Sequence, residues 1–233
     1  MIAQDSPKAN RLLARMPPKD RARMLEDCTL VELDFEQILV EPGEAIANVY
    51  FPTRSFISLL VPIGAMSIEV ALVGNEGMFG LPVAFGVNVS QVRALVQGAG
   101  PALRMTSSRF KAELARNAAL KRSVGRYAFV RMSQLGQAAG CNRFHVVEAR
   151  LARWLLMTAD RAHSLTFHIT HEFLAFMLGV RRVGITMAAS ALQNQKLIRY
   201  TRGNLTILDR PGLEKASCEC YQADLDLYGT MFA

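Results

Sequence analysis

The pattern of apolar and polar positions changes twice along the chain. Residues 29–106 contain short, strand-prone apolar runs separated by turns rich in Gly and Pro. Residues 107–139 carry apolar side chains at steps of three and four, which predicts one long helix. Residues 146–209 mix helical and strand-like periods. The pattern predicts an α+β chain in which a β-roll of jelly-roll type is followed by a long helix and a smaller mixed domain.

The β-roll is predicted from many short runs with turn residues between them. The turns fall at Glu41-Pro42-Gly43-Glu44, at residues 62–64 and at residues 74–77, and two short helices broken by Pro17-Pro18 precede the roll. The predicted strands are Thr29–Leu33, Gln37–Val40, Phe56–Val61, Ile68–Val73, Val92–Val96 and Ala102–Met105.

The stripe on the predicted long helix is of coiled-coil type and favours a dimer interface. Its members are Leu120, Val124, Tyr127, Ala128, Met132 and Leu135. The alternative is that the stripe packs on its own β-roll, and a helix of this length has two faces for both roles. Gly140-Cys141-Asn142 is typical of a helix end, so we expect the long helix to stop there and form a hinge.

Residues 170–209 predict a helix, a tight turn, a second helix and a hairpin. Thr170 suits an N-cap, and Gly179 suits a turn through positive φ. The second helix has an apolar face of Ile185, Ala188, Ala189 and Leu192 and an opposite face of Arg182, Thr186, Ser190 and Gln193. Strand-prone runs then flank a turn at Gly203-Asn204. This order is typical of a helix-turn-helix followed by a wing, and so of a DNA-binding domain.

The charge distribution agrees with two functionally different parts. The 233 residues carry a net charge of +7. Between residues 19 and 84 there are four basic and ten acidic residues, whereas between 140 and 210 there are ten basic and four acidic ones. A merely basic surface would explain the total but not this segregation. An acidic sensor domain joined to a basic DNA-binding domain explains both, because clustered positive charge attracts phosphates.

From about residue 10 to 215 the chain resembles the Crp–Fnr family of bacterial transcription regulators. The sequences E-P-G-E, V-Y-F-P and G-N-E-G-M-F-G follow one another as landmarks do in cyclic-nucleotide-binding β-rolls, and the helix-turn-helix follows. The resemblance implies a sequence-specific regulator that binds palindromic double-stranded DNA as a homodimer, and that contacts RNA polymerase if it activates. It implies a sensor domain at 1–106, a dimerisation helix and hinge at 107–140, a winged helix-turn-helix at 141–216 and a tail at 217–233.

The sequence departs from this family where a cyclic nucleotide would be held. The family places a Glu after Phe-Gly and an Arg-Ser or Arg-Thr pair later, but Leu81-Pro82 follows Phe79-Gly80 here, and Ala94 follows Arg93. The residues that the resemblance assigns to an effector are thus Phe79, Gly80, Leu81 and Arg93. We expect an effector other than cyclic AMP or cyclic GMP, or none, because a buried phosphate without partners is costly. Arg93 could equally be a solvated or salt-bridged strand residue.

A second departure lies in the recognition helix. Members of the family read bases with an Arg, a Glu and a second Arg, whereas Arg182, Val183 and Met187 occupy these positions here. Only Arg182 matches, so we expect a different operator. Arg182 could contact guanine, and Val183 or Met187 a thymine methyl group. The predicted DNA-contacting residues are Thr170, His171, Arg181, Arg182, Val183, Thr186, Met187, Ser190, Arg199 and Arg202.

No catalytic or metal site is predicted. The four histidines all follow residue 144, so a metal-dependent oxygenase site cannot form within the roll at 29–106. Cys218 and Cys220 form a Cys-x-Cys pair, but Cys28 and Cys141 are distant in sequence, so we expect buried thiols, with a redox role left open. The N-terminus lacks a signal-peptide pattern, which predicts a cytoplasmic protein. The rival function is a ligand-binding module whose helix-turn-helix no longer reads DNA.

Overall fold

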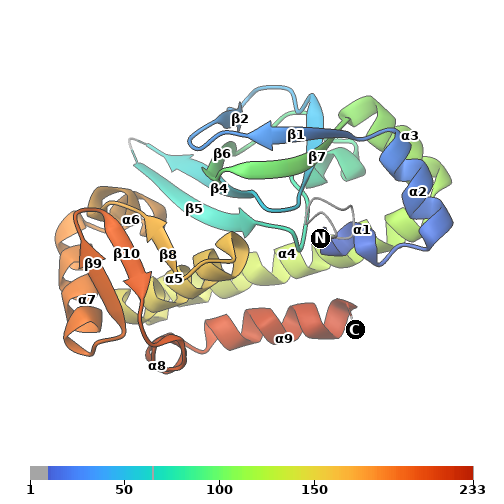
Figure 1. Cartoon of the computed structure of the whole chain (residues 1–233). Coiled ribbons are helices and arrows are strands. Elements are labelled where there is room, and N and C mark those ends of the chain that lie inside the picture. The colour runs from blue at the N-terminus through green and yellow to red at the C-terminus, as the bar shows by residue number, and fades with distance from the viewer. Residues whose placement is uncertain (1–9, 65, 233) are drawn as a thin grey trace. The chain divides into compact units, whose positions relative to one another are not determined.

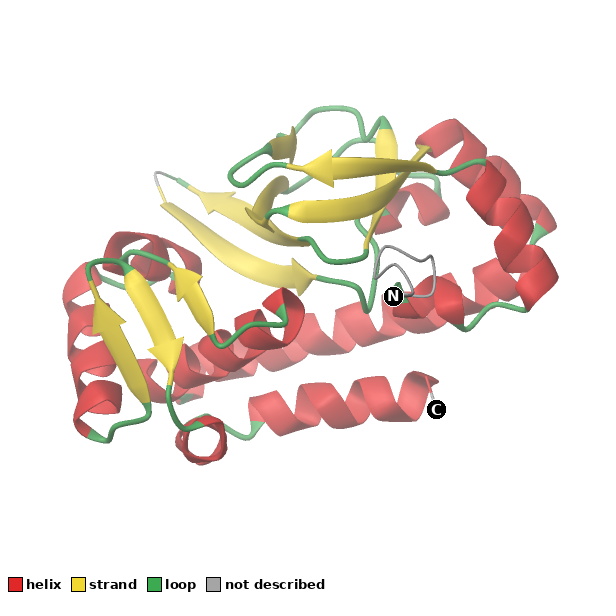
Figure 2. Cartoon of the chain, in the orientation of Figure 1, coloured by secondary structure: helices red, strands yellow, loops and turns green. Residues whose placement is uncertain are grey.

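The computed structural model describes residues 10–64 and 66–232 and confirms the predicted α+β class (Figures 1 and 2). A β-domain comes first, the long helix α4 follows, and a helical domain with a three-stranded sheet completes the chain. Residues 1–9, for which no signal peptide is expected, residue 65 and residue 233 lie outside the described part.

The β-domain consists of two antiparallel sheets whose strand orders are β1-β7-β3 and β2-β6-β4-β5. All six predicted strands are present, and Asn48–Pro52 adds one that the sequence analysis missed. Short helices α1 (Arg11–Ala14) and α2 (Pro18–Glu26) precede the sheets, and the 3-10 helix η2 (Leu81–Phe85) lies between β5 and β6 in the chain. The strands are β1 (Thr29–Leu33), β2 (Ile38–Val40), β3 (Asn48–Pro52), β4 (Phe56–Ile63), β5 (Met66–Val73), β6 (Arg93–Gly98) and β7 (Gly100–Thr106).

The predicted single helix at 107–139 is in fact two helices, α3 (Ser107–Arg116) and α4 (Ala118–Phe144). The break is at Asn117, whose backbone is extended and whose side chain accepts a hydrogen bond from the Leu120 amide at 3.0 Å. This side-chain bond starts a new helix as an N-cap does.

The predicted helix stop at Gly140-Cys141-Asn142 is also wrong. Helix α4 runs through all three residues to Phe144, and the amide of His145 still donates to the carbonyl of Cys141 at 3.1 Å. A helix tolerates one Gly at a modest cost, and no residue here adopts the left-handed conformation that would end it. The connection to the next helix therefore lies at 145–146.

The C-terminal elements follow the predicted order. Helix α5 (Val147–Ala162) precedes β8 (Thr166–His168), α6 (His171–Leu178) and α7 (Arg182–Asn194), and the strands then pair in the order β8-β10-β9. The hairpin strands are β9 (Ile198–Thr201) and β10 (Asn204–Ile207). Helices α8 (Arg210–Ala216) and α9 (Cys220–Phe232) complete the described chain.

The tail is ordered as α9 and packs on α5. Arg153 of α5 forms a largely buried ion pair with Asp224 of α9 at 2.7 Å. The hydroxyl of Tyr221 donates to Asp160 of α5 at 2.8 Å and accepts from Arg210 at 2.7 Å. These polar contacts fix the C-terminal tail to α5.

Contacts divide the chain into two compact units. One contains the described residues up to Leu59 together with Ala71–Arg131, and the other contains Leu60–Val70 together with the chain from Met132 onward. The tip of the β4–β5 hairpin thus groups with the helix-turn-helix, and the indole of Trp154 donates to Glu69 at 2.9 Å. Helix α4 continues from one unit into the other.

Within the described residues, no single helix has the length and apolar composition needed to cross a membrane. Helices α6 and α7 reach that composition only as a pair, with a bend of 109° between them.

Glu113 of α3 provides the first testable prediction. Its side chain is fully buried, and burial raises its pKa, but hydrogen bonds from Asn117, Arg116 and Arg23 outweigh burial and leave the pKa below the usual value. A carboxylate with a lowered pKa stabilises the fold above its unfolded pKa, near 4.3, and this stabilisation is lost as the pH falls through the folded pKa. Glu113→Gln should therefore cost about 1–3 kcal/mol at pH 7.

Urea unfolding of the wild type and Glu113→Gln between pH 3 and pH 7 measures this effect. The difference between the two proteins should shrink toward acid pH. Glu36→Gln serves as the control, because Glu36 is an exposed carboxylate that no described ion pair includes. A difference that stays constant with pH would show that the charge of Glu113 contributes nothing.

Candidate nucleic-acid interface

The first helix of the helix-turn-helix is held by the two residues predicted from the sequence. The hydroxyl of Thr170 accepts from the Phe173 amide at 3.1 Å and so caps α6. Gly179 ends the helix at φ +64°, in the left-handed region, and a Cβ there would also lie 3.1 Å from Ile68. Only Gly adopts this conformation without strain, so the sequence analysis placed the turn correctly.

The second helix, α7, has the two predicted faces. Ile185, Ala188, Ala189 and Leu192 are buried and confirm the apolar face. The opposite face exposes Arg182, Thr186 and Ser190, together with Val183 and Met187, whose side chains are 62% and 69% exposed. Exposed apolar side chains on a short helix do not stabilise the fold, so this surface is available to a partner.

A stacked pair of rings connects this helix to α6 and to the wing. The ring of His171 stacks on Tyr200 of β9 at 4.4 Å, and its Nδ1 lies 3.1 Å from the hydroxyl of Thr186. That hydroxyl also bonds to the Arg182 carbonyl at 3.2 Å. Tyr200 in turn donates from its hydroxyl to Ile169 and from its amide to Gln193, at 2.6 and 2.9 Å.

These contacts change the roles expected for two predicted residues. Burial, with help from the charge of Arg182, lowers the pKa of His171, so the ring is neutral near pH 7 and is not a cationic phosphate contact. The Thr186 hydroxyl already bonds within the protein. The sequence analysis did not identify Tyr200 as a residue that orients the site. The one sequence feature that could have indicated this role is a large aromatic side chain in the first strand of the hairpin.

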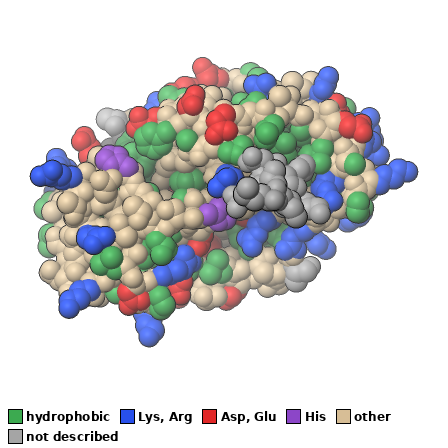
Figure 3. Space-filling model, in the orientation of Figure 1, with side chains coloured by type: hydrophobic (Ala, Val, Ile, Leu, Met, Phe, Trp, Pro, Cys, Tyr) green, Lys and Arg blue, Asp and Glu red, His purple; other side chains and the backbone are tan. Residues whose placement is uncertain are grey.

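The wing hairpin turns one residue earlier than predicted. Arg202 and Gly203 form the two-residue loop with φ of +50° and +82°, and Asn204 already pairs with Thr201. Two consecutive positive φ values are typical of a tight hairpin turn. This loop exposes Arg202, and β9 exposes Arg199 (Figure 3 shows basic side chains on this part of the surface). Arg181, directly before α7, is exposed as well.

The candidate effector residues all belong to the β-domain, but two of them have structural partners. Arg93 forms an ion pair with Glu41 at 2.8 Å, which agrees with the alternative that it is a salt-bridged strand residue. Phe79 is buried and its backbone pairs with Tyr50. Gly80 adopts φ +93° before η2, where a Cβ would meet Val49, and Leu81 is half-buried in η2. An anion at Arg93 would therefore have to replace Glu41.

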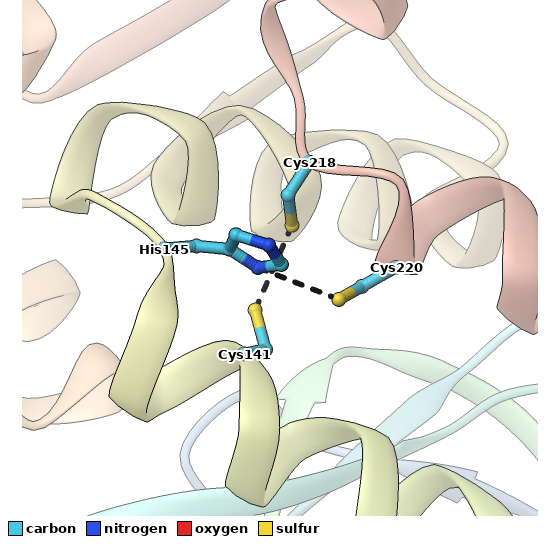
Figure 4. Close-up of side chains that lie close together, drawn as sticks. All are labelled: Cys141, His145, Cys218 and Cys220. Carbon is cyan, nitrogen blue, oxygen red and sulfur yellow. Dashed lines mark hydrogen bonds between the residues drawn. The ribbon is translucent and has the colours of Figure 1, made fainter.

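One group of potential metal ligands exists in the second unit. Cys141, His145, Cys218 and Cys220 place their ligand atoms within 4.8 Å of one another. Cys141 is distant from Cys218 and Cys220 in sequence, and on that ground the sequence analysis did not group them. Helix α4 continues to Phe144 and places Cys141 beside the connection between α8 and α9 (Figure 4). Cys28 lies in the other unit and is not part of the group.

Comparison with known proteins supports the DNA-binding domain directly. Residues 149–216 match the family model of the Crp-like helix-turn-helix domain. A comparison with curated protein sequences gave no significant match.

Solved structures with the same fold span both units of the chain. FixK2 from Bradyrhizobium japonicum has a TM-score of 0.69 at 13% identity, with 82% of this chain and 98% of that chain covered. The c-di-GMP-responsive regulator CLP from Xanthomonas campestris has a TM-score of 0.68 at 14% identity, covering 82% and 99%. A CRP/FNR-family transcriptional regulator from Thermus thermophilus has a TM-score of 0.68 at 17% identity, covering 81% and 98%.

The fold and the helix-turn-helix match together define a DNA-binding transcription regulator with an N-terminal β-domain. Residues 149–216 belong to the Crp-like helix-turn-helix family, and the chain has the fold of a solved CRP/FNR-family regulator.

Proposed function

We propose that this regulator binds two-fold palindromic operators as a homodimer, reads bases with α7, and responds to an effector other than cyclic AMP or cyclic GMP, or to none. The observation that carries the proposal is the exposed face of α7. Arg182, Val183 and Met187 project from a helix whose other face is buried and whose position is set by Thr170, Gly179 and the stacked His171 and Tyr200. A rigid helix with exposed Arg and apolar side chains fits a major groove.

Helix α4 supports the homodimer. Of the predicted interface residues, Leu120, Val124, Tyr127 and Ala128 are at most 7% exposed within one chain, so they pack on their own unit. Gly77 shows this, because a Cβ there would clash with the ring of Tyr127. Only Met132 and Leu135 of the predicted set are exposed, at 71% and 46%.

The exposed stripe of α4 lies beside the predicted one. It consists of Gly125, Phe129, Met132, Gly136 and Ala139, at steps of four, three, four and three. Phe129 is 51% exposed, and Gly125 and Gly136 have open space where a Cβ would be. Apolar side chains at this spacing form a coiled-coil seam, and the glycines would let a second helix approach closely. We propose this stripe, flanked by Leu135, as the dimer interface.

Two copies of α7 would then enter successive major grooves, with half-site centres about 34 Å apart. RNA polymerase would be a further partner if the protein activates. We keep the domain bounds given in the sequence analysis, except that the dimerisation helix is now α4, at 118–144.

The test of this proposal is fluorescence anisotropy with a random duplex at two salt concentrations. A regulator that neutralises several phosphates loses affinity steeply as salt rises, by a slope of about −0.9 per phosphate contacted. A flat salt response would favour the rival, a sensor module that no longer binds DNA.

The ion pair between Arg93 and Glu41 leads to a prediction about the effector. The guanidinium of Arg93, which a cyclic phosphate would need as its partner, is already paired with Glu41. Leu81-Pro82 supplies no carboxylate to bind the ribose hydroxyl. Calorimetry with millimolar cyclic AMP or cyclic GMP should therefore show no saturable heat. Cyclic di-GMP belongs in the same series because the Xanthomonas regulator with this fold responds to it. A micromolar isotherm with either mononucleotide would contradict the prediction.

A further inference from the structure

Three cysteines and a histidine from two separate parts of the chain meet in the second unit (Figure 4). Cys141 lies in the last turn of α4, and His145 follows one turn later at the α4–α5 connection. Cys218 lies in the connection between α8 and α9, and Cys220, after Glu219, is the first residue of α9. The three cysteine side chains are buried together at 1–6% exposure, while His145 is partly exposed.

We propose that Cys141, His145, Cys218 and Cys220 bind one zinc ion. Three thiolates and one imidazole are a common tetrahedral set for structural zinc. Zinc bonds of about 2.3 Å to sulfur and about 2.0–2.1 Å to nitrogen give a tetrahedron with edges of about 3.5–3.8 Å. The sulfurs of Cys141 and Cys218 are 3.6 Å apart, and Cys220 Sγ is 3.6 Å from His145 Nδ1.

The spacing also distinguishes a single ion from other occupants. An iron–sulfur cluster places several irons and sulfides between its thiolates. Ligand atoms that all lie within 4.8 Å of one another leave room for one ion only. A disulfide would need the sulfurs at about 2.05 Å, and all four cysteines are free thiols in the structure.

Residues outside the ligand set prepare two of the ligands. His145 Nε2 lies 3.1 Å from the carboxylate of Glu219, and Nδ1 lies 3.6 Å from Cys220 Sγ. The tautomer that donates from Nε2 to Glu219 has Nδ1 free to bind the ion. A carboxylate that orients a ligand histidine in this way is a recurring feature of zinc sites. The amide of Gln137 donates to the sulfur of Cys220 at 3.0 Å. Buried thiols packed by chance would need neither contact.

The surrounding charge fits a complex of three thiolates. Three thiolates, a neutral histidine and Zn²⁺ sum to −1, and the guanidinium of Arg153 lies next to Cys141.

The ion would join the end of the long helix to the C-terminal tail. His145 belongs to the two-residue connection between α4 and α5, and Cys218–Cys220 leads from the α8–α9 connection into α9. Zinc would therefore fix the connection that orients the helix-turn-helix on α4, so its removal should lower both the thermal midpoint and operator affinity.

Zinc content per chain tests the proposal, measured by mass spectrometry of metals in protein purified under reducing conditions. The wild type and Cys28→Ser, which changes the one cysteine outside the group, should each hold one zinc per chain. Cys220→Ser and His145→Ala should hold much less. Cobalt in place of zinc should give the intense visible bands of a tetrahedral thiolate complex in the first two proteins only.

Glu219→Gln tests the site without changing a ligand, so it should fold normally. The Glu219 side chain is exposed and contacts the site through His145. The substitution should weaken zinc binding about 10–100-fold in a chelator competition, whereas Asp226→Asn on α9 should not. Wild-type protein without zinc and without the cobalt bands would overturn the proposal. Equal zinc loss in Cys28→Ser would overturn it too.

Discussion

Replacing Phe129 or Met132 with Asp should convert the protein from dimer to monomer and strongly weaken operator binding. Both side chains lie on the exposed stripe of α4 and are 51% and 71% exposed within one chain. Burying an unpaired carboxylate in an apolar seam costs several kcal/mol, which strongly disfavours the dimer. A monomer engages only one half-site, so its operator affinity should fall about 10²–10⁴-fold.

Sedimentation velocity and anisotropy on a two-fold operator measure the two effects. Phe85→Asp is the matched control, because Phe85 is an aromatic residue with 64% exposure outside α4. Val124→Asp should behave differently: Val124 is buried within one chain, so this variant should lower the thermal midpoint of folding rather than dissociate a folded dimer. A Phe129→Asp protein that remains a dimer would place the interface elsewhere.

Arg182→Ala should cost about 1–3 kcal/mol on the best operator and relax the preference at one base pair per half-site. Arg182 is exposed at the first turn of α7, where the N-terminal end of a recognition helix meets base edges. Arg182→Lys is the informative partner variant. It keeps the charge but loses the planar fork that makes two hydrogen bonds to guanine, so it should lose the base preference and keep the salt slope.

Arg202 should behave in the opposite way, because it lies on the wing loop, from which we expect it to contact the backbone of DNA. Arg202→Asn removes the charge and keeps the turn, since Asn-Gly is favoured where two residues have positive φ. It should weaken all duplexes alike and reduce the salt slope by about one. Selection of operators from random DNA separates these outcomes. An unchanged motif with Arg182→Ala would mean that α7 is not the reading helix.

Local signals in the sequence were sufficient for most elements. The turn at Gly179, the cap at Thr170 and the buried face of α7 were all predicted correctly, because each depends on one residue's backbone preference or on helical spacing. The six predicted strands were found for the same reason. The missed strand, Asn48–Pro52, is buried on both sides and contains a Pro, so it shows no alternation.

The sites were harder to predict because they depend on packing. The α4 stripe was recognised, but four of its six members face the chain's own core. Spacing reveals that a helix has an apolar face, and only the fold decides which of two apolar faces is covered. The thiol group was missed for a related reason: the expected stop at Gly140 removed the helical turn that places Cys141 beside His145.

The sequence by itself determined the order of elements, the helix-turn-helix and the charge difference between the two parts, because these depend on neighbouring residues and on composition. The tertiary structure alone decided that Arg93 pairs with Glu41, that His171 stacks on Tyr200, and that Cys141 meets Cys218. Each of these pairs joins residues 29 to 77 positions apart. Local preference carries no information over such distances, and only the packed fold brings the partners together.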